Sequence, residues 1–170
     1  MLKKTRQLSA SESPIATLIH FIGHSKQVKL DFLIQDIPMA DIATPYERIG
    51  GEDGVRTLCE TFYRIMCDTP QTQLIRDLHP ENINISEEKL YLFLTGWLGG
   101  PPLYTDRYGH PRLRARHLPF SIGIEERDQW LYCMAQALKT MNLDDLFAEQ
   151  LMSSFVQTAD FMRNRQEQTV

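Results

Sequence analysis

Apolar residues recur at helical spacing along most of the chain after residue 45. The first run, residues 55–66, repeats every three or four positions and predicts a helix that follows a turn at Gly50–Gly54 and ends before Pro70. A second run, residues 86–98, is apolar almost all round, which predicts a helix buried on more than one side. Two further stripes predict helices over residues 123–141 and 143–163. With no strand expected after residue 45, the pattern predicts an all-α main domain.

The first 44 residues follow a different pattern. Apolar positions have helical spacing over residues 15–22 and alternate over residues 28–34, as they do in a strand or an extended arm. Pro38 and Pro45 then interrupt any regular element. We therefore expect an N-terminal extension, a helix plus an extended arm, that packs on the main domain or on a partner.

Composition and charge narrow the classes of function. The 170 residues are 42% hydrophobic and 24% charged, which permits a real core, and the net charge of -4 gives no reason to expect nucleic acid or an anionic membrane as a partner. No apolar run reaches the roughly 18 residues of a membrane span, and the basic N-terminus lacks the apolar stretch of a signal peptide. Cys59, Cys67 and Cys133 have no metal-type spacing and are expected to be buried thiols. A cytoplasmic protein is expected.

The segment of residues 103–123 is rich in Arg, Pro and Gly and predicts a loop with short helical turns. Three arginines alternate directly before His117, and Pro119 stiffens the backbone just after it. Haem requires one axial imidazole, a wide apolar slot and cations for two propionates, and this segment supplies each kind of residue. A basic surface loop explains the same spacing equally well, so the residues alone leave both interpretations open.

Three other polar or aromatic side chains are candidates for chemistry, namely Tyr63, His79 and Trp130. A tyrosine or tryptophan on an apolar face is commonly a core residue whose polar atom meets a nearby carbonyl. A lone histidine before a proline is commonly a loop cap. Taken singly, each is more typical of structure than of function.

The chain closely resembles the truncated haemoglobins of the second group in four stretches, which are YERIGGEDGVRTLCETFY, LHPEN, LFLTGWLGGPPLYTDRYGHPRLRARHLPFSIG and ERDQWLYCM. The run from Gly99 to Phe120 is the most specific part. The resemblance implies a shortened globin, with two antiparallel helix pairs stacked two over two around haem b. It divides the chain into an N-terminal extension (1–44), a truncated globin domain (45–165) and a tail (166–170).

The resemblance also implies roles for individual residues. His117 matches the proximal ligand of the haem iron, and Tyr63 and Trp130 match the distal residues of the family's B and G helices. His79 falls in the loop after the C helix, where relatives carry tyrosine, phenylalanine or histidine. The haem pocket is expected to include Phe62, Leu90, Phe93, Leu94, Leu113, Phe120, Ile122 and Met134, with Arg114 and Arg116 binding the propionates.

Such a site would bind dioxygen, nitric oxide, carbon monoxide or peroxide. Two distal donors, each worth on the order of 1–3 kcal/mol, would slow oxygen release, which suits redox chemistry better than oxygen transport. A peroxidase-like or nitric oxide dioxygenase-like activity fed by an unknown reductase is therefore expected, and a homodimer is left open. Two alternatives remain: a haem-based gas or redox sensor that acts through the N-terminal extension, and a haem-free helical interaction module.

Overall fold

The computed structural model describes residues 43–165, and the helix and arm expected within residues 1–42 lie outside this part of the chain, as does the tail. The described residues are helical without a strand, as the pattern predicts. The elements are α3 (Pro45–Arg48), α4 (Gly51–Asp68), η1 (Pro70–Thr72), α5 (Gln73–Asp77), α6 (Asn84–Trp97), α7 (Leu103–Tyr108), α8 (Leu113–His117), α9 (Ile124–Thr140) and α10 (Asp145–Met162). Within residues 43–165 no helix has the length and apolar character of a bilayer span.

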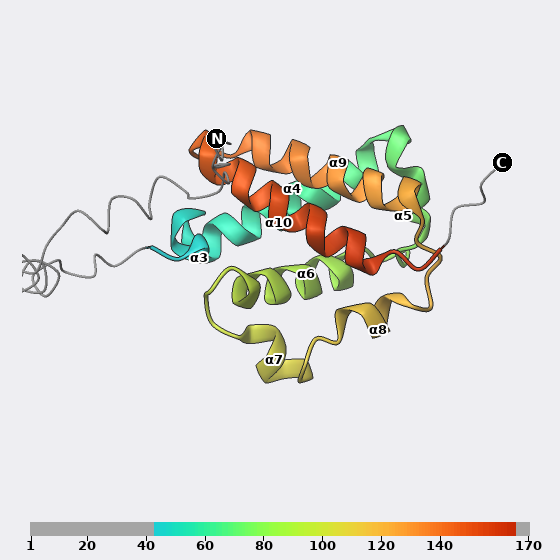
Figure 1. The fold of residues 1–170 in the computed structure, drawn as a ribbon, viewed down its shortest axis with the longest axis horizontal. Coiled ribbons are helices and arrows are strands. Elements are labelled where there is room, and N and C mark those ends of the chain that lie inside the picture. Colours follow the sequence, from blue (N-terminus) through green and yellow to red (C-terminus); the bar gives the residue numbers. More distant parts are fainter. Residues whose placement is uncertain (1–42, 166–170) are drawn as a thin grey trace, which may run out of the picture. The chain divides into compact units, whose positions relative to one another are not determined.

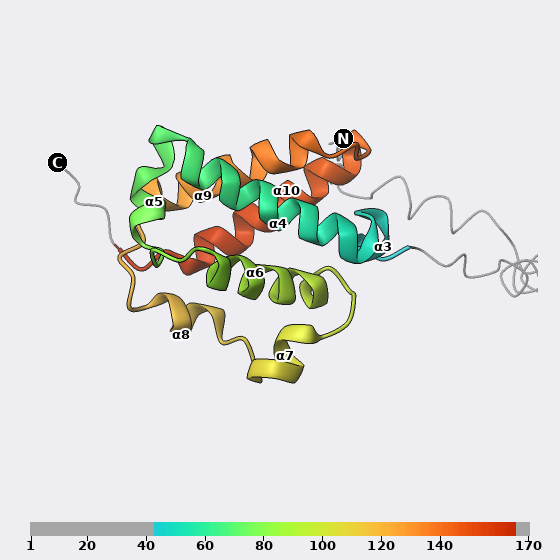
Figure 2. The same ribbon diagram turned by 180° about the vertical axis from the view of Figure 1, so that it is seen from behind.

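The four long helices form two antiparallel pairs, α4 with α6 and α9 with α10 (Figures 1 and 2). Helix α4 also packs against α9, so one pair lies on the other. The short helices α7 and α8 follow α6 on the side away from α9 (Figure 1). This two-over-two arrangement is the one that the resemblance to truncated haemoglobins implies.

Helix α4 begins earlier than predicted. The stretch Gly50–Gly54 was expected to be a turn, but the helix already begins at Gly51, after Gly50 with a φ of 103°. A Cβ atom on Gly54 would lie 1.9 Å from the carbonyl oxygen of Ile49, so the first helical turn can pack on the preceding chain only because this residue is glycine. The glycines therefore permit a tight entry into the helix instead of a turn before it.

Helix α6 begins at Asn84, two residues before the predicted N-cap Ser86. Its end was predicted correctly: Leu98 is the C-cap, and Gly99 follows with a φ of 94° in the left-handed region. The backbone N–H of Tyr46 donates to the Leu98 carbonyl oxygen at 2.8 Å, which ties α3 to this end of α6.

The remaining boundaries agree with the sequence except in one connection. Helix α9 agrees with the predicted residues 123–141 to within one residue at each end, and α10 begins after the N-cap Asp144, whose carboxylate accepts from the Phe147 N–H. The connection after Pro70, expected to be polar loop, instead forms η1 and α5. The Thr72 hydroxyl bonds there to the carbonyl oxygens of Met66 and Thr69.

The three cysteines are free thiols, as expected. Cys59 and Cys133 are buried in the core, and burial raises the pKa of Cys133 to about 12. Cys67 is exposed, which corrects the expectation that all three would be buried.

Candidate functional site

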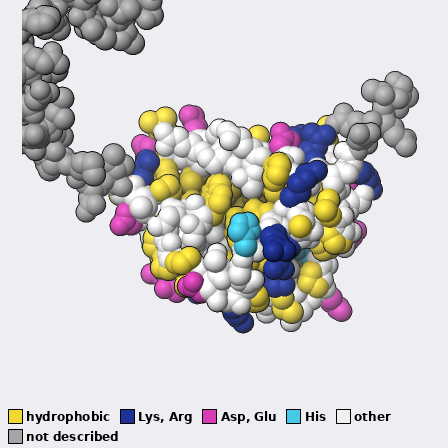
Figure 3. All heavy atoms as spheres, turned by 60° about the horizontal axis from the view of Figure 1, so that its bottom comes forward, with side chains coloured by type: hydrophobic (Ala, Val, Ile, Leu, Met, Phe, Trp, Pro, Cys, Tyr) yellow, Lys and Arg dark blue, Asp and Glu magenta, His cyan; other side chains and the backbone are white. Residues whose placement is uncertain are grey.

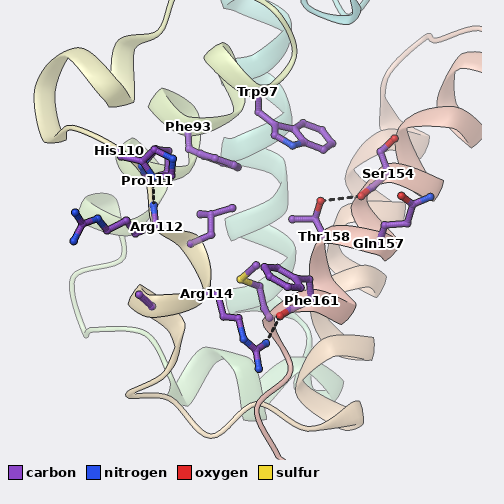
Figure 4. A pocket seen from close by; sticks show the side chains of 13 residues that line it. Phe93, Trp97, His110, Pro111, Arg112, Arg114, Ser154, Gln157, Thr158 and Phe161 are labelled. Carbon is purple, nitrogen blue, oxygen red and sulfur yellow. Dashed lines mark hydrogen bonds between the residues drawn. The ribbon is translucent and has the colours of Figure 1, made fainter.

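A cavity of about 790 Å³ lies between α6, α8 and the C-terminal half of α10 (Figure 4). Phe93 and Trp97 project into it from α6, and Phe161 faces it from α10 (Figure 4). The lining consists of Phe93, Trp97, His110, Pro111, Arg112, Leu113, Arg114, Ala115, Ser154, Gln157, Thr158, Phe161 and Met162. A volume of this size with a mostly apolar wall is typical of a site for a large organic ligand.

Cations mark one side of the cavity. Arg112 and Arg114 line it together with the imidazole of His110, and none of the described lining residues is acidic. The face formed by α7 and α8 carries Lys or Arg side chains and a histidine beside apolar surface (Figure 3). In a chain of net charge -4, this local excess of positive charge is suited to ligand carboxylates.

His117 is the last residue of α8 and is half-buried. Its Nδ1 lies 2.7 Å from the carbonyl oxygen of Leu113, one helical turn earlier. A carbonyl can only accept, so Nδ1 carries the proton, and the lone pair of Nε2 is left without a partner among the described residues. This tautomer and orientation are those of a histidine that binds a metal through Nε2.

Tyr63 and His79 lie against each other, with ring centroids 5.6 Å apart and ring planes at 80°. Nδ1 of His79 lies 2.7 Å from the Ile75 carbonyl oxygen, and burial lowers the pKa of this histidine, which favours its neutral form. Burial raises the pKa of Tyr63, so its hydroxyl remains a donor, and no described residue accepts from it. The pair therefore offers a free O–H donor next to a neutral imidazole.

Trp130 connects these residues to the cavity through ring contacts. Its ring centroid lies 5.4 Å from that of Phe62, which in turn contacts Tyr63 at 5.0 Å. On its other side Trp130 contacts Phe155 at 5.8 Å, and Phe155 stacks on the cavity-lining Trp97 at 5.0 Å. The indole N–H has no acceptor among the described residues. The two free donors thus belong to one continuous aromatic cluster that ends at the cavity wall.

The structure brings only part of the predicted pocket to the cavity. Phe93, Leu113 and Arg114 line it. Phe62, Leu94 and Met134 are buried in the core, Ile122 is buried, and Leu90 packs half-buried against the core. Phe120 is 41% exposed. Arg114 and Arg116 are both exposed, and both donate to backbone carbonyl oxygens, Arg114 to those of Phe161 and Arg163 and Arg116 to that of Pro111. They differ in that only Arg114 lines the cavity.

Ten of the thirteen lining residues were not among the predicted site residues, including Trp97, His110, Phe161 and Met162. Trp97 lies one helical turn after Phe93 on the same face of α6, so the spacing of the helix would have identified it. The two residues of α10 carry no local signal, because the last turn of that helix reaches the site only through tertiary packing.

A two-over-two helical fold with an apolar, arginine-lined cavity beside α8, the helix that ends in His117, is that of a globin. His117 itself, like Tyr63, His79 and Trp130, is not among the lining residues. The sequence profile described as bacterial-like globin matches residues 44–164. The chain belongs to this family and, within it, to the group II truncated haemoglobins. Membership implies that the protein binds haem and a gaseous ligand such as oxygen.

Individual relatives agree with this assignment. The chain is 42% identical over 123 residues to the group 2 truncated hemoglobin YjbI of Bacillus subtilis, covering 72% of this chain and 90% of the relative. A cold-adapted truncated hemoglobin from the Antarctic bacterium Pseudoalteromonas haloplanktis TAC125 has a TM-score of 0.71 at 41% identity, over 73% of this chain and 100% of that one. A group II 2-on-2 hemoglobin from Agrobacterium tumefaciens has a TM-score of 0.72 at 38% identity, over 75% and 99%.

Proposed function

We propose that the chain binds haem b in the cavity between α6, α8 and α10, in which Nε2 of His117 would hold the iron. The observation that carries the proposal is the bond from His117 Nδ1 to the Leu113 carbonyl oxygen, which fixes the ring and leaves Nε2 free. The residues fit the group in two further respects. The cavity wall is largely apolar and aromatic, and Arg112 and Arg114 line it with charges that suit two propionates.

Haem b, when bound, supplies the iron that takes up dioxygen, nitric oxide, carbon monoxide or peroxide. The chain supplies the donors: the Tyr63 hydroxyl and the Trp130 indole N–H, neither of which has an acceptor among the described residues. A hydrogen bond to a charged acceptor is worth on the order of 1.5–3 kcal/mol, and each 1.4 kcal/mol is about tenfold in affinity. Two such donors make release slow, which favours redox turnover over transport.

The proposed turnover is the detoxification of nitric oxide or peroxide, with a reductase as the electron donor. The free thiols of Cys59, Cys67 and Cys133 are compatible with the reducing cytoplasm as its location.

The assignment of the ligand is tested by titrating purified protein with haem and following the Soret band. Wild type is expected to bind one haem per chain. His117→Gly is expected to lose the five-coordinate ferrous spectrum and to regain it when free imidazole is added, because imidazole can occupy the space of the lost ring.

His110→Gly is the matched control. His110 also lines the cavity, but its Nδ1 accepts from the Arg112 N–H and it lies outside α8. We expect this variant to keep the wild-type spectrum. A His117→Gly spectrum that is the same as wild type, or a loss confined to His110→Gly, would contradict the proposed ligand.

A further inference from the structure

The loop that follows His117 is held by two side chains from the far end of the sequence, Asn164 and Arg165, and the Arg165 Nε donates to the Ser121 hydroxyl. Asn164, two residues after the end of α10, donates from Nδ2 to the carbonyl oxygens of His117 (3.0 Å) and Phe120 (2.8 Å). Its Oδ1 accepts from the backbone N–H of Ile122 at 3.0 Å. The backbone N–H of Asn164 also donates to the Ile122 carbonyl oxygen at 3.0 Å. One amide therefore closes three contacts over six consecutive residues.

These contacts of Asn164, called the Asn164 clamp below, matter because α8 is too short to be stabilised by its own backbone hydrogen bonds. The helix has five residues, Leu113–His117, and its last turn runs into irregular chain that continues to Gly123. A helix this short is not stable by its own backbone bonds and depends on packing. Helix α8 packs against α10, and Arg114 reaches the same end of α10 by donating to the carbonyl oxygens of Phe161 and Arg163 (Figure 4 shows the Phe161 bond).

We propose that Asn164 is a positioning residue for His117. By holding the carbonyl oxygen of His117 itself, and two backbone groups within the next five residues, it fixes the height and tilt of the imidazole relative to the cavity. The inference rests on the proposed function, since it concerns the histidine assigned there as the iron ligand. The C-terminal end of α10 thereby sets the geometry on the proximal side.

The chemistry requires an amide at this position. Two carbonyl oxygens need donors and one N–H needs an acceptor, and a carboxamide is the side chain of this size that offers both. An aspartate has the same shape, but its carboxylate is acceptor-only and would oppose the carbonyl oxygens of His117 and Phe120. Asn164→Asp thus reverses the interaction without opening a cavity.

The test uses haem-loaded, full-length protein in the ferrous, ligand-free state. The iron–histidine stretching band in the resonance Raman spectrum reports the geometry of the proximal bond, and transfer of haem to an excess of apomyoglobin reports haem loss. Asn164→Asp is expected to shift or broaden the band and to speed haem loss about tenfold, the equivalent of roughly one lost hydrogen bond. Asn164→Ser, which removes Nδ2 without adding a charge, is expected to change both in the same direction and less.

Two controls separate positioning from general loss of stability. Asn142→Asp makes the same chemical change at an exposed position whose side chain has no bond to a described residue. Thr44→Ala removes the capping box of α3, far from α8 along the molecule (Figure 1), and lowers stability without touching the Asn164 clamp. Neither control is expected to move the band.

The outcomes are distinct. An iron–histidine band and haem-loss rate in both Asn164 variants that equal those of wild type would overturn the positioning role, while the proposed function would stand. An equal band shift in Thr44→Ala would also overturn it, because the shift would then follow stability alone. Absence of the band in wild type would remove both the proposed ligand and this inference.

Discussion

Replacing Tyr63 by phenylalanine should make the protein release oxygen faster and leave its fold about as stable as before. Tyr63 is 5% exposed, and its hydroxyl has no acceptor among residues 43–165. The ring contacts with Phe62 and His79 do not involve the hydroxyl, so phenylalanine can keep them. The hydroxyl oxygen is not among the described side-chain atoms that are fully buried without a partner, so its removal should change the free energy of unfolding little.

The expected changes in unfolding free energy and in oxygen dissociation rate both follow from the loss of one hydrogen-bond donor, the Tyr63 hydroxyl. We expect the free energy of unfolding of the apoprotein to change by less than about 1 kcal/mol, because the hydroxyl makes no hydrogen bond to a described residue. If the hydroxyl donates to bound oxygen with about 1.5–3 kcal/mol, its loss should raise the oxygen dissociation rate by about tenfold to a hundredfold. A substitution that only damaged the fold would change the two quantities together, in the unfavourable direction.

The assay combines urea unfolding of the apoprotein with stopped-flow replacement of oxygen by carbon monoxide in the ferrous holoprotein. Tyr132→Phe is the matched control, because it removes the same atom from a side chain of α9 that is 44% exposed. The control should leave both quantities at wild-type values. An oxygen dissociation rate in Tyr63→Phe equal to that of wild type, or a loss of more than about 1 kcal/mol of stability, would refute the reasoning.

Three further predictions concern other parts of the site. Burial holds the pKa of His79 below its ordinary value of 6.5, so as the pH falls below about 6.5 the unfolded chain binds this proton before the folded chain does. The stability of the apoprotein, measured by urea midpoints, should therefore fall as the pH decreases through that range, and it should fall less steeply in His79→Gln. Parallel pH profiles for the two proteins would contradict this cause. Phe155→Ala should cost about 3–5 kcal/mol in chemical unfolding, because Phe155 is 1% exposed and packs between two tryptophan rings; a cost below about 1 kcal/mol would show that the cluster repacks freely. Arg114→Ala should speed haem loss to apomyoglobin about tenfold and Arg116→Ala much less, since only the former lines the cavity; equal effects would remove the distinction between the two arginines.

Local sequence determined the helices well where a single element explains the pattern. The stripe of α9, the stop after α6 and the short turns around His117 all follow from spacing, glycine and proline. Residues alone could not decide whether His117 binds a metal, because a basic surface loop has the same pattern. The resemblance to truncated haemoglobins supplied that hypothesis, and the match to the bacterial-like globin profile shows that the chain belongs to this family.

The features that the sequence did not predict depend on contacts between distant segments. The early start of α4 requires Gly54 to pack on Ile49, and nothing in a helical periodicity reports that approach. Phe161 lines the cavity together with residues of α6 and α8, and Asn164 bonds to the loop that follows His117. In both cases the residues in contact are more than forty positions apart in the sequence. A polar residue just after a helix is ordinarily a cap, so its role here becomes visible only in three dimensions.

The tie between α3 and α6 joins the first helix of the described chain to one wall of the cavity. Gly100 lies so close to the Tyr46 ring that a Cβ atom would come within 2.7 Å of it, and the Tyr46 N–H is bonded to the carbonyl at the end of α6. Phe93 and Trp97, on the last two turns of that helix, form one wall of the cavity. Because position 100 carries no side chain, α3 can pack directly on the end of the helix that forms this wall.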